Sequence, residues 1–178
     1  MSKESTSVSL STEMAELIPP SEISSLEQGV FVGQVADDRG FIIESEAPIY
    51  VSIRMNAGGG AQAGALVSKG LSALGNTFRV GSYTNGNPQT NYLNFVSVMA
   101  TEDNTLVNFS NLPTGLIIKN YTGTTPVNTT LNEGESYTIA TNCTDATVNQ
   151  DGLIGCLIES DKPIVVNCGS TNGSFGTG

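Results

Sequence analysis

The chain has 178 residues, which is enough for one domain, or two small ones, with a buried core. Its 17 acidic and 7 basic residues give a formal net charge of -10, which disfavours binding to nucleic acids and to anionic membrane surfaces. Because the chain contains no histidine, the Ser-His and Cys-His pairs of common hydrolases are excluded.

The N-terminal part, residues 1–27, is rich in Ser, Thr and Glu and contains Pro19 and Pro20. This composition predicts an irregular lead-in without regular strands. No apolar run here is long enough for a signal peptide, and no stretch of the chain approaches the roughly 20 apolar residues of a membrane-spanning helix. We therefore expect no membrane insertion, and any export signal is expected to lie outside this segment.

Short apolar runs separated by turn residues begin at about residue 29, a pattern typical of antiparallel strands. Residues 28–76 are interpreted as the tail of a preceding β module followed by a Gly-rich loop. Within them, residues 56–76 carry few large apolar side chains, which predicts a long loop with at most one helical turn. Long loops often bind ligands, so Gln62, Ser68 and Lys69 are candidate contact residues.

Strand character returns at residues 77–81, and the Asn-Gly-Asn-Pro run that follows predicts a tight turn. Residues 82–92 are therefore a second candidate binding loop, with Tyr83, Asn85 and Asn87 as contact residues. Residues 77–178 are interpreted as a complete β module, truncated at its C-terminal side. Its further strands are predicted at residues 93–100, 105–109, 116–119, 127–131, 136–140, 153–159 and 164–167.

An internal repeat is the most informative feature of the sequence. Residues 40–52 align without a gap on residues 155–167, and seven of the thirteen positions are identical. Each copy is predicted to form a hairpin. It has an apolar strand, a polar turn and a second strand that begins with Pro48 or Pro163. The repeat predicts an all-β fold of repeated antiparallel modules, sandwich-like, with part of a β-propeller as the alternative.

Carboxylate pairs such as Glu102 with Asp103 and Glu133 with Glu135 stand at predicted turns, so they indicate turn chemistry rather than acid–base catalysis. The Asn-Gln-Asp-Gly run at residues 149–152 resembles part of a calcium loop but lacks the closing Glu. A turn explains it as well, so no cofactor is expected and calcium is kept as an alternative.

The three cysteines, Cys143, Cys156 and Cys168, form no CxxC pair. A disulfide with one spare thiol suits an oxidising compartment, whereas the apolar runs around Cys156 and Cys168 suit small buried hydrophobes. The sequence does not choose between the two, and no pairing is assigned.

Several motifs in a fixed order carry a family resemblance: ALGNTFRVG at 73–81, FVSVMATEDNTLVNFS at 95–110, GESY at 134–137 and ESDKPIVVNCGS at 159–170. Over residues 30–178 the chain resembles the IgGFc-binding protein N-terminal domain family. More narrowly, it is similar to the version in large secreted proteins of gliding bacteria, which often end in a gliding-motility-type C-terminal sorting domain. The resemblance implies repeated β architecture, export to the cell surface, and binding rather than catalysis. It supplies no catalytic residue, and IgG binding need not transfer to a bacterial relative.

We therefore predict a non-enzymatic, secreted or cell-surface adhesion module that recognises a glycan or protein through the loops at 56–76 and 82–92. Other domains of the same longer chain are its further expected partners. Two alternatives stay open: a structural spacer domain of a large surface protein, and an ancillary domain of a secreted polysaccharide-degrading enzyme.

Overall fold

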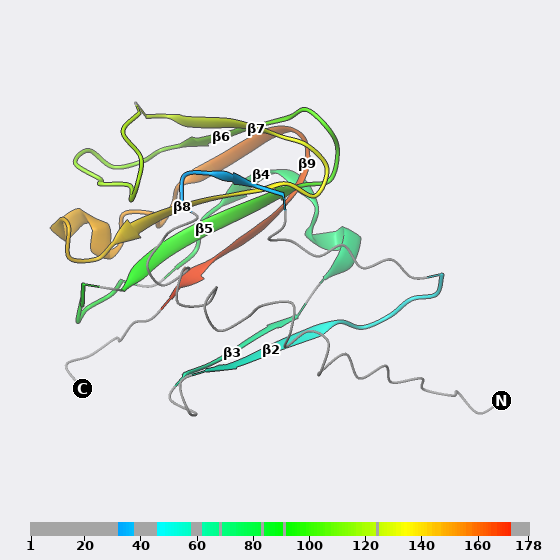
Figure 1. Ribbon diagram of the computed structural model, residues 1–178, viewed down its shortest axis with the longest axis horizontal. Helices are drawn as coiled ribbons and strands as arrows, with labels where there is room; N and C mark the ends of the chain where they lie inside the picture. The colour runs from blue at the N-terminus through cyan, green and yellow to red at the C-terminus, as the bar shows by residue number, and fades with distance from the viewer. Residues whose placement is uncertain are drawn as a thin grey trace.

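Three long antiparallel chain segments, each bent near its middle, form the frame of the structure (Figure 1). The computed structural model describes residues 32–37, 46–57, 62–67, 69–82, 84–90, 92–123 and 125–171. The first segment is β5 (Leu93–Ala100) followed by β6 (Thr105–Ser110). The second is β7 (Val127–Leu131) followed by β8 (Ser136–Asn142), and the third is the single strand β9 (Leu157–Ser170).

The strand register shows that all three segments bend at the same place. Before the bend, β5 lies between β8 and β9, so that Asn94 is opposite both Thr141 and Ser170. After the bend, β6 lies between β7 and the beginning of β9, so that Asn108 is opposite both Asn128 and Glu159. The bend itself falls at residues 101–104, 132–135 and 161–163, and we call it the corner.

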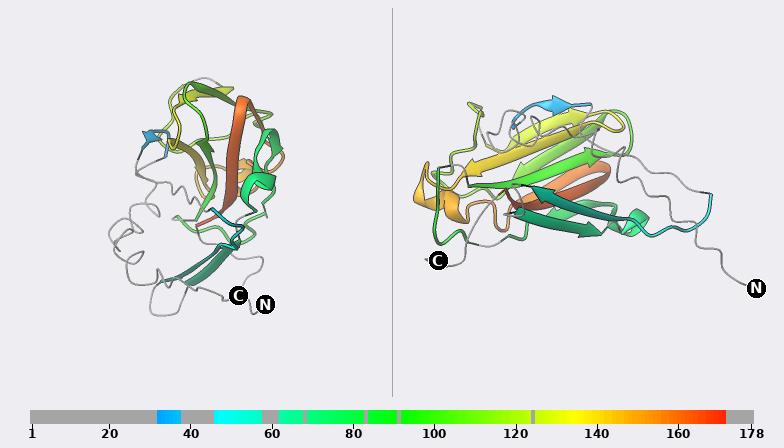
Figure 2. Two further views of the ribbon diagram at one scale, coloured as in Figure 1. Left: turned by 90° about the vertical axis from the view of Figure 1, so that its right-hand side faces the viewer. Right: turned by 60° about the horizontal axis from the view of Figure 1, so that its bottom comes forward.

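The corner divides the seven-stranded sheet into two halves. The first half-sheet has the order β1, β8, β5 and the C-terminal part of β9, where β1 comprises Val35–Ala36. The second half-sheet has the order β7, β6, the N-terminal part of β9, and β4, which comprises Gly75–Arg79. Because the bent segments run through both halves, the sheet folds on itself and is nearly closed into a barrel (Figure 2). The prediction of an all-β, sandwich-like antiparallel fold is confirmed.

The core lies between the two half-sheets and follows the alternation of side chains along each strand. On β5, Val96, Val98 and Ala100 point inward and are buried, whereas the intervening residues are partly exposed. Burying each large apolar side chain contributes about 1.5–3 kcal/mol relative to leaving it in water. The other strands add the following buried residues to the core: Val107, Phe109, Val127, Leu131, Tyr137, Ile139, Ile158 and Ile164.

Side-chain carboxylates stabilise the corner by accepting hydrogen bonds from backbone groups that have no strand partner there. Asp161 Oδ1 accepts the Leu106 N–H at 2.8 Å, and Asp103 Oδ1 accepts the Glu133 N–H at 3.1 Å. These bonds link residues far apart in sequence across the bend. These acidic side chains therefore act as hydrogen-bond acceptors for turn backbone, as expected from their positions at predicted turns.

The hairpin predicted for residues 155–167 is wrong, because Leu157–Ser170 is one continuous strand. Pro163 lies at the bend: the pairing of β9 with β6 ends at Ser160, and its pairing with β5 begins at Ile164. The missing N–H of proline therefore costs no ladder hydrogen bond. In the other copy, residues 40–45 lie outside the described residues and residues 46–51 form no strand, so the described parts of the two copies differ.

Residues 56–76 are not a single loop, which is a second correction. Here β2 (Ser52–Ala57) and β3 (Gln62–Val67) form a separate two-stranded antiparallel sheet, followed by the 3₁₀ helix η2 (Gly70–Ala73). Pairing with β2 supplies backbone hydrogen bonds that compensate for the weak strand propensity of Ala and Gly in β3. In Figure 1 this hairpin lies below the large sheet.

Two further expectations concern residues 116–119 and the membrane. The strand predicted at residues 116–119 is wrong: residues 116–118 are irregular and follow a turn that the Leu116 N–H closes on Pro113 O at 3.2 Å, with Ile118 buried. No helix among the described residues has the length and hydrophobicity that crossing a bilayer requires. The boundaries proposed for the β modules stay a prediction, although β1 joins the same sheet as β8.

Candidate functional site

Three loops meet at the end of the folded sheet opposite the corner, on the left in Figure 1. They are residues 84–92, 111–126 and 143–156, taken over the parts that the structure describes, and we call this region the loop end. The third loop contains the 3₁₀ helix η3 (Thr147–Gln150). Loops carried by a rigid sheet are the usual place for binding residues, so the loop end is the candidate site.

Asn149, on η3, holds the loop 111–126 in place. Its side chain is fully buried, its Oδ1 accepts the Ile117 N–H at 3.0 Å, and its Nδ2 donates to Ile117 O at 3.1 Å. The same Nδ2 also donates to Asn142 O at 2.9 Å. The amide thus satisfies both backbone groups of Ile117 in the way that a neighbouring strand would.

The backbone carbonyl of Gln150 ties the loop 84–92 to the same 3₁₀ helix. It accepts the Asn85 N–H at 3.0 Å and a hydrogen bond from Asn94 Nδ2, also at 3.0 Å. Asn142 adds a further link, because its Nδ2 donates to Thr90 O at 2.6 Å. Buried asparagines therefore connect all three loops, and we call this set of contacts the asparagine network.

Cys143 belongs to the asparagine network as a neutral thiol. Asn85 Nδ2 donates to its Sγ at 3.4 Å, and both side chains are buried. Burial raises the pKa of the Cys143 thiol, although hydrogen bonds from Asn85 and Asn94 oppose the shift. A buried, protonated thiol is a poor nucleophile, so this contact is structural.

All three cysteines are free thiols, and no disulfide joins them. Cys156 is fully buried in the core, and desolvation raises its pKa to about 11 while the nearby Arg79 opposes the shift. Cys168 is half-buried and its Sγ donates to Gly81 O at 2.9 Å. The interpretation as a small buried hydrophobe fits Cys156, whereas Cys168, for which it was also predicted, is only half-buried.

The described outer surface of the loop end is polar and largely uncharged, and it carries the large exposed apolar side chains of two isoleucines. Ile117 is 47% exposed and Ile154 is 42% exposed. Around them lie exposed polar residues and glycine from the three loops: Gly86, Gln89, Thr90, Asn111, Thr114, Thr144, Asp145, Thr147 and Asp151.

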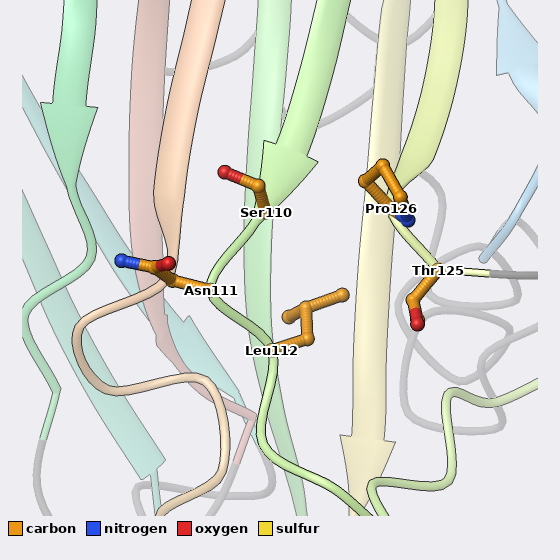
Figure 3. A pocket seen from close by; sticks show the side chains of 5 residues that line it. All are labelled: Ser110, Asn111, Leu112, Thr125 and Pro126. Carbon is orange, nitrogen blue, oxygen red and sulfur yellow. The ribbon is translucent and has the colours of Figure 1, made fainter.

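A depression of about 220 Å³ lies at the edge of the loop end, where β6 stops and β7 begins. Figure 3 shows its lining, in which Leu112 extends from one chain segment toward the segment that carries Thr125 and Pro126. Ser110 and Asn111 complete the lining. The depression is small and open, so it suits part of a larger ligand rather than an enclosed small molecule.

The structure places the six predicted contact residues in different surroundings. Gln62 is the first residue of β3, opposite Ala57, and Lys69 is exposed just before η2. Asn87 is half-buried in a turn of the loop end. Ser68 and Tyr83 lie outside the described residues.

Asn85 requires a correction, because its side chain is fully buried and is not available to a ligand at the surface. A turn-forming asparagine was expected to be exposed, but here the turn folds inward and the amide contacts Cys143. Asn94 and Asn149, two members of the asparagine network, were missed by sequence reasoning. For Asn94 a signal existed, since it alternates with the core residues Val96 and Val98.

The candidate calcium residues are engaged in the backbone contacts of the third loop. Asn149 Oδ1 and the Gln150 carbonyl accept the hydrogen bonds described above, and Asp151 O accepts the Ile154 N–H at 2.8 Å. Among the described residues no group of three or more His, Cys, Asp or Glu side chains is arranged to hold a metal ion.

Comparison with protein families matches residues 63–177 to the family described as IgGFc binding protein. The matched range contains β4 to β9 and the whole loop end. Neither the curated proteins nor the solved structures contain a match.

Proposed function

Because the chain belongs to the IgGFc binding protein family, we propose that it is a non-enzymatic binding module of a secreted or cell-surface protein. The module binds a protein or glycan ligand through the loop end. The observation that carries this proposal is the asparagine network, which fixes three loops against one another from below and leaves their outer side chains for contact.

Rigid loops favour binding for a thermodynamic reason. A loop that must be ordered by its ligand loses conformational entropy on binding, and this loss lowers the affinity. At the loop end this conformational entropy is already lost during folding, because buried amides such as that of Asn149 fix the loop backbone. The exposed Ile117 and Ile154 supply apolar contact, and the surrounding hydroxyl and amide groups supply hydrogen bonds.

The acidic balance of the chain restricts the ligand. A formal net charge of -10 repels polyanions and favours uncharged or basic surfaces. The carboxylates described at the corner accept backbone hydrogen bonds, and the thiols of Cys143 and Cys156 are buried. The structural roles of these carboxylates and thiols support a binding function rather than catalysis.

The decisive experiment compares two variants of the full chain. Ile117→Asn with Ile154→Asn removes the apolar contact of the loop end, whereas Leu71→Asn changes a side chain that is 85% exposed on η2. Both are applied to immobilised IgG Fc, to mucin and to a printed glycan array. The loop-end variant should lose at least tenfold in affinity for whichever probe the wild type retains, and Leu71→Asn should bind like the wild type.

Equal binding by the two variants would show that the loop end is not the contact surface. If the wild type retains none of the probes, the spacer interpretation gains support. The narrower resemblance to proteins of gliding bacteria stays a prediction.

A further inference from the structure

The second half-sheet aligns four polar residues across its four strands. Asn128 on β7 lies opposite Asn108 on β6, Asn108 lies opposite Glu159 on β9, and Glu159 lies opposite Thr77 on β4. Residues directly opposite one another in a sheet point to the same face. The residues come from four distant parts of the sequence, and we call them the polar row.

The polar row faces away from the core. Its neighbours along the strands, such as Val107, Phe109 and Ile158, are buried in the core, so alternation directs the row to the outer face. Asn128, Glu159 and Thr77 are exposed accordingly, while Asn108, in the middle, is half-buried.

The centre of the row carries an amide oxygen that is not satisfied. Asn108 Oδ1 is buried and has no hydrogen-bond partner among the described residues. A buried acceptor without a donor is unfavourable, so the partly exposed Asn108 side chain gains a hydrogen bond if its amide turns outward to a ligand hydroxyl. On the same face, Leu106 lies two residues before Asn108 and is 50% exposed, and Leu157 lies two residues before Glu159. The row is therefore flanked by apolar side chains on both sides.

We propose that the polar row is a second binding surface and that its ligand is a neutral polysaccharide chain. Two amides, a carboxylate and a hydroxyl offer both donors and acceptors to the hydroxyl groups of sugar rings. The flanking leucines contact the apolar C–H faces of the same rings. The net charge of -10 disfavours acidic polysaccharides, although the exposed Arg79, two residues after Thr77 on the same face, offsets the charge of Glu159; uncharged polysaccharides are therefore the favoured ligands.

The dimensions of the row suit an extended chain. Neighbouring strands are about 4.8 Å apart, so four strands span about 14 Å, enough to contact more than one sugar ring. The row contains no Trp or Tyr, the residues that dominate protein–protein hot spots. Without a ring to stack on the sugar, hydrogen bonds carry the binding, so a single site binds weakly and several modules bind together more tightly.

This surface is separate from the loop end, and its assignment does not rest on the function proposed there. The test uses affinity gel electrophoresis of the full chain in the neutral polysaccharides laminarin, mannan and xylan, with alginate as an acidic comparison. At least one neutral polysaccharide should retard the wild type, and alginate should not.

Two variants with matched chemistry locate the site. Asn128→Ala with Thr77→Ala removes two exposed groups of the row and should weaken retardation at least tenfold. Asn167→Ala with Ser72→Ala removes an exposed amide and an exposed hydroxyl that lie outside both the polar row and the loop end, and should leave retardation unchanged. Thermal unfolding of both variants checks that they are folded.

An independent measurement follows the wild type alone. The side-chain amide resonances of Asn108 and Asn128 should shift when the retarding polysaccharide is titrated, whereas those of the buried Asn149 should not. Retardation by no neutral polysaccharide, retardation by alginate, or equal retardation of both variants would each overturn the proposal. Loss of IgG Fc binding in the polar-row variant would also overturn the proposal, because the surface would then bind a protein.

Discussion

Asn149 replaces a strand neighbour for Ile117: its side-chain amide accepts the Ile117 N–H at 3.0 Å and donates to the Ile117 carbonyl at 3.1 Å. Ile117 itself belongs to no strand and is paired with no described strand residue. One buried side chain therefore decides whether the backbone of Ile117 is satisfied.

The first prediction follows from this pair. Asn149→Ala leaves the N–H and C=O of Ile117 without their partners and should lower the free energy of unfolding by about 3 kcal/mol. Thr147→Ala, an exposed change on the same 3₁₀ helix, should alter it by less than about 0.5 kcal/mol. Urea denaturation followed by circular dichroism measures both. A small effect of Asn149→Ala would mean that the loop does not depend on the amide.

A second prediction concerns the packing of Gly152 beneath the loop 111–126. A Cβ atom at this position would lie 2.2 Å from Leu116 Cδ1 and 2.5 Å from Val148 O. Gly152→Ala should therefore destabilise the protein by about 1–3 kcal/mol through overpacking. At Gly81 a Cβ meets nothing within 4 Å, so Gly81→Ala should be neutral or slightly stabilising. If thermal unfolding ranks the two variants in the reverse order, the packing described here is incorrect.

The third prediction is a dependence of stability on pH. Burial raises the pKa of the Cys156 thiol to about 11, whereas a cysteine in an unfolded chain has a pKa of about 8.5. Between about pH 9 and 11 the unfolded chain loses this proton and the folded chain keeps it. The free energy of unfolding should therefore fall as pH rises through this window, by about 2 kcal/mol from this group.

Cys156→Ala removes that contribution and should flatten the slope, even if the variant is less stable at pH 7. The slope should not vanish, because burial also raises the pKa of Tyr137 and Cys143. Urea denaturation at a series of pH values compares the variant with the wild type. Identical slopes would show that Cys156 titrates alike in both states.

The fourth prediction tests the corner. Asp161→Ala removes the acceptor of the Leu106 N–H and should cost about 1 kcal/mol, while Asp161→Asn keeps an acceptor and should cost less. Glu102→Ala is the control, because there the backbone carbonyl, rather than the side chain, accepts from Thr105 Oγ1 at 2.7 Å. Equal stability of the Asp161→Ala and Glu102→Ala variants would argue against this role of the carboxylate.

Sequence reasoning located most strands of the large sheet because their signals are local. The apolar runs predicted at 93–100 and 127–131 coincide with β5 and β7, since each has buried residues at its inward positions and turn residues at its ends. The bend in β9 was not predictable in the same way. The Ser-Asp-Lys-Pro run has the composition of a turn, and only the partners of β9 show that the strand continues past it.

The candidate site was predicted less well, because its essential contacts are between distant residues. The residues 82–92 do reach the loop end, but Asn85 faces inward because Gln150, 65 positions later, accepts its N–H. Asn149 looked like an ordinary turn residue, since its partner Ile117 is 32 positions away. The polar row was equally hidden, because its members share a face only through the register of four strands.

The passage of β9 through both half-sheets has a mechanical consequence. The two layers share covalent backbone at the corner, so they cannot slide apart as two independent sheets. A pulling force on one layer is transmitted along the chain to the other, and detaching β9 removes partners of β5 and β6 together. We therefore expect such a module to unfold under tension as a single cooperative unit, as small single domains usually do at equilibrium.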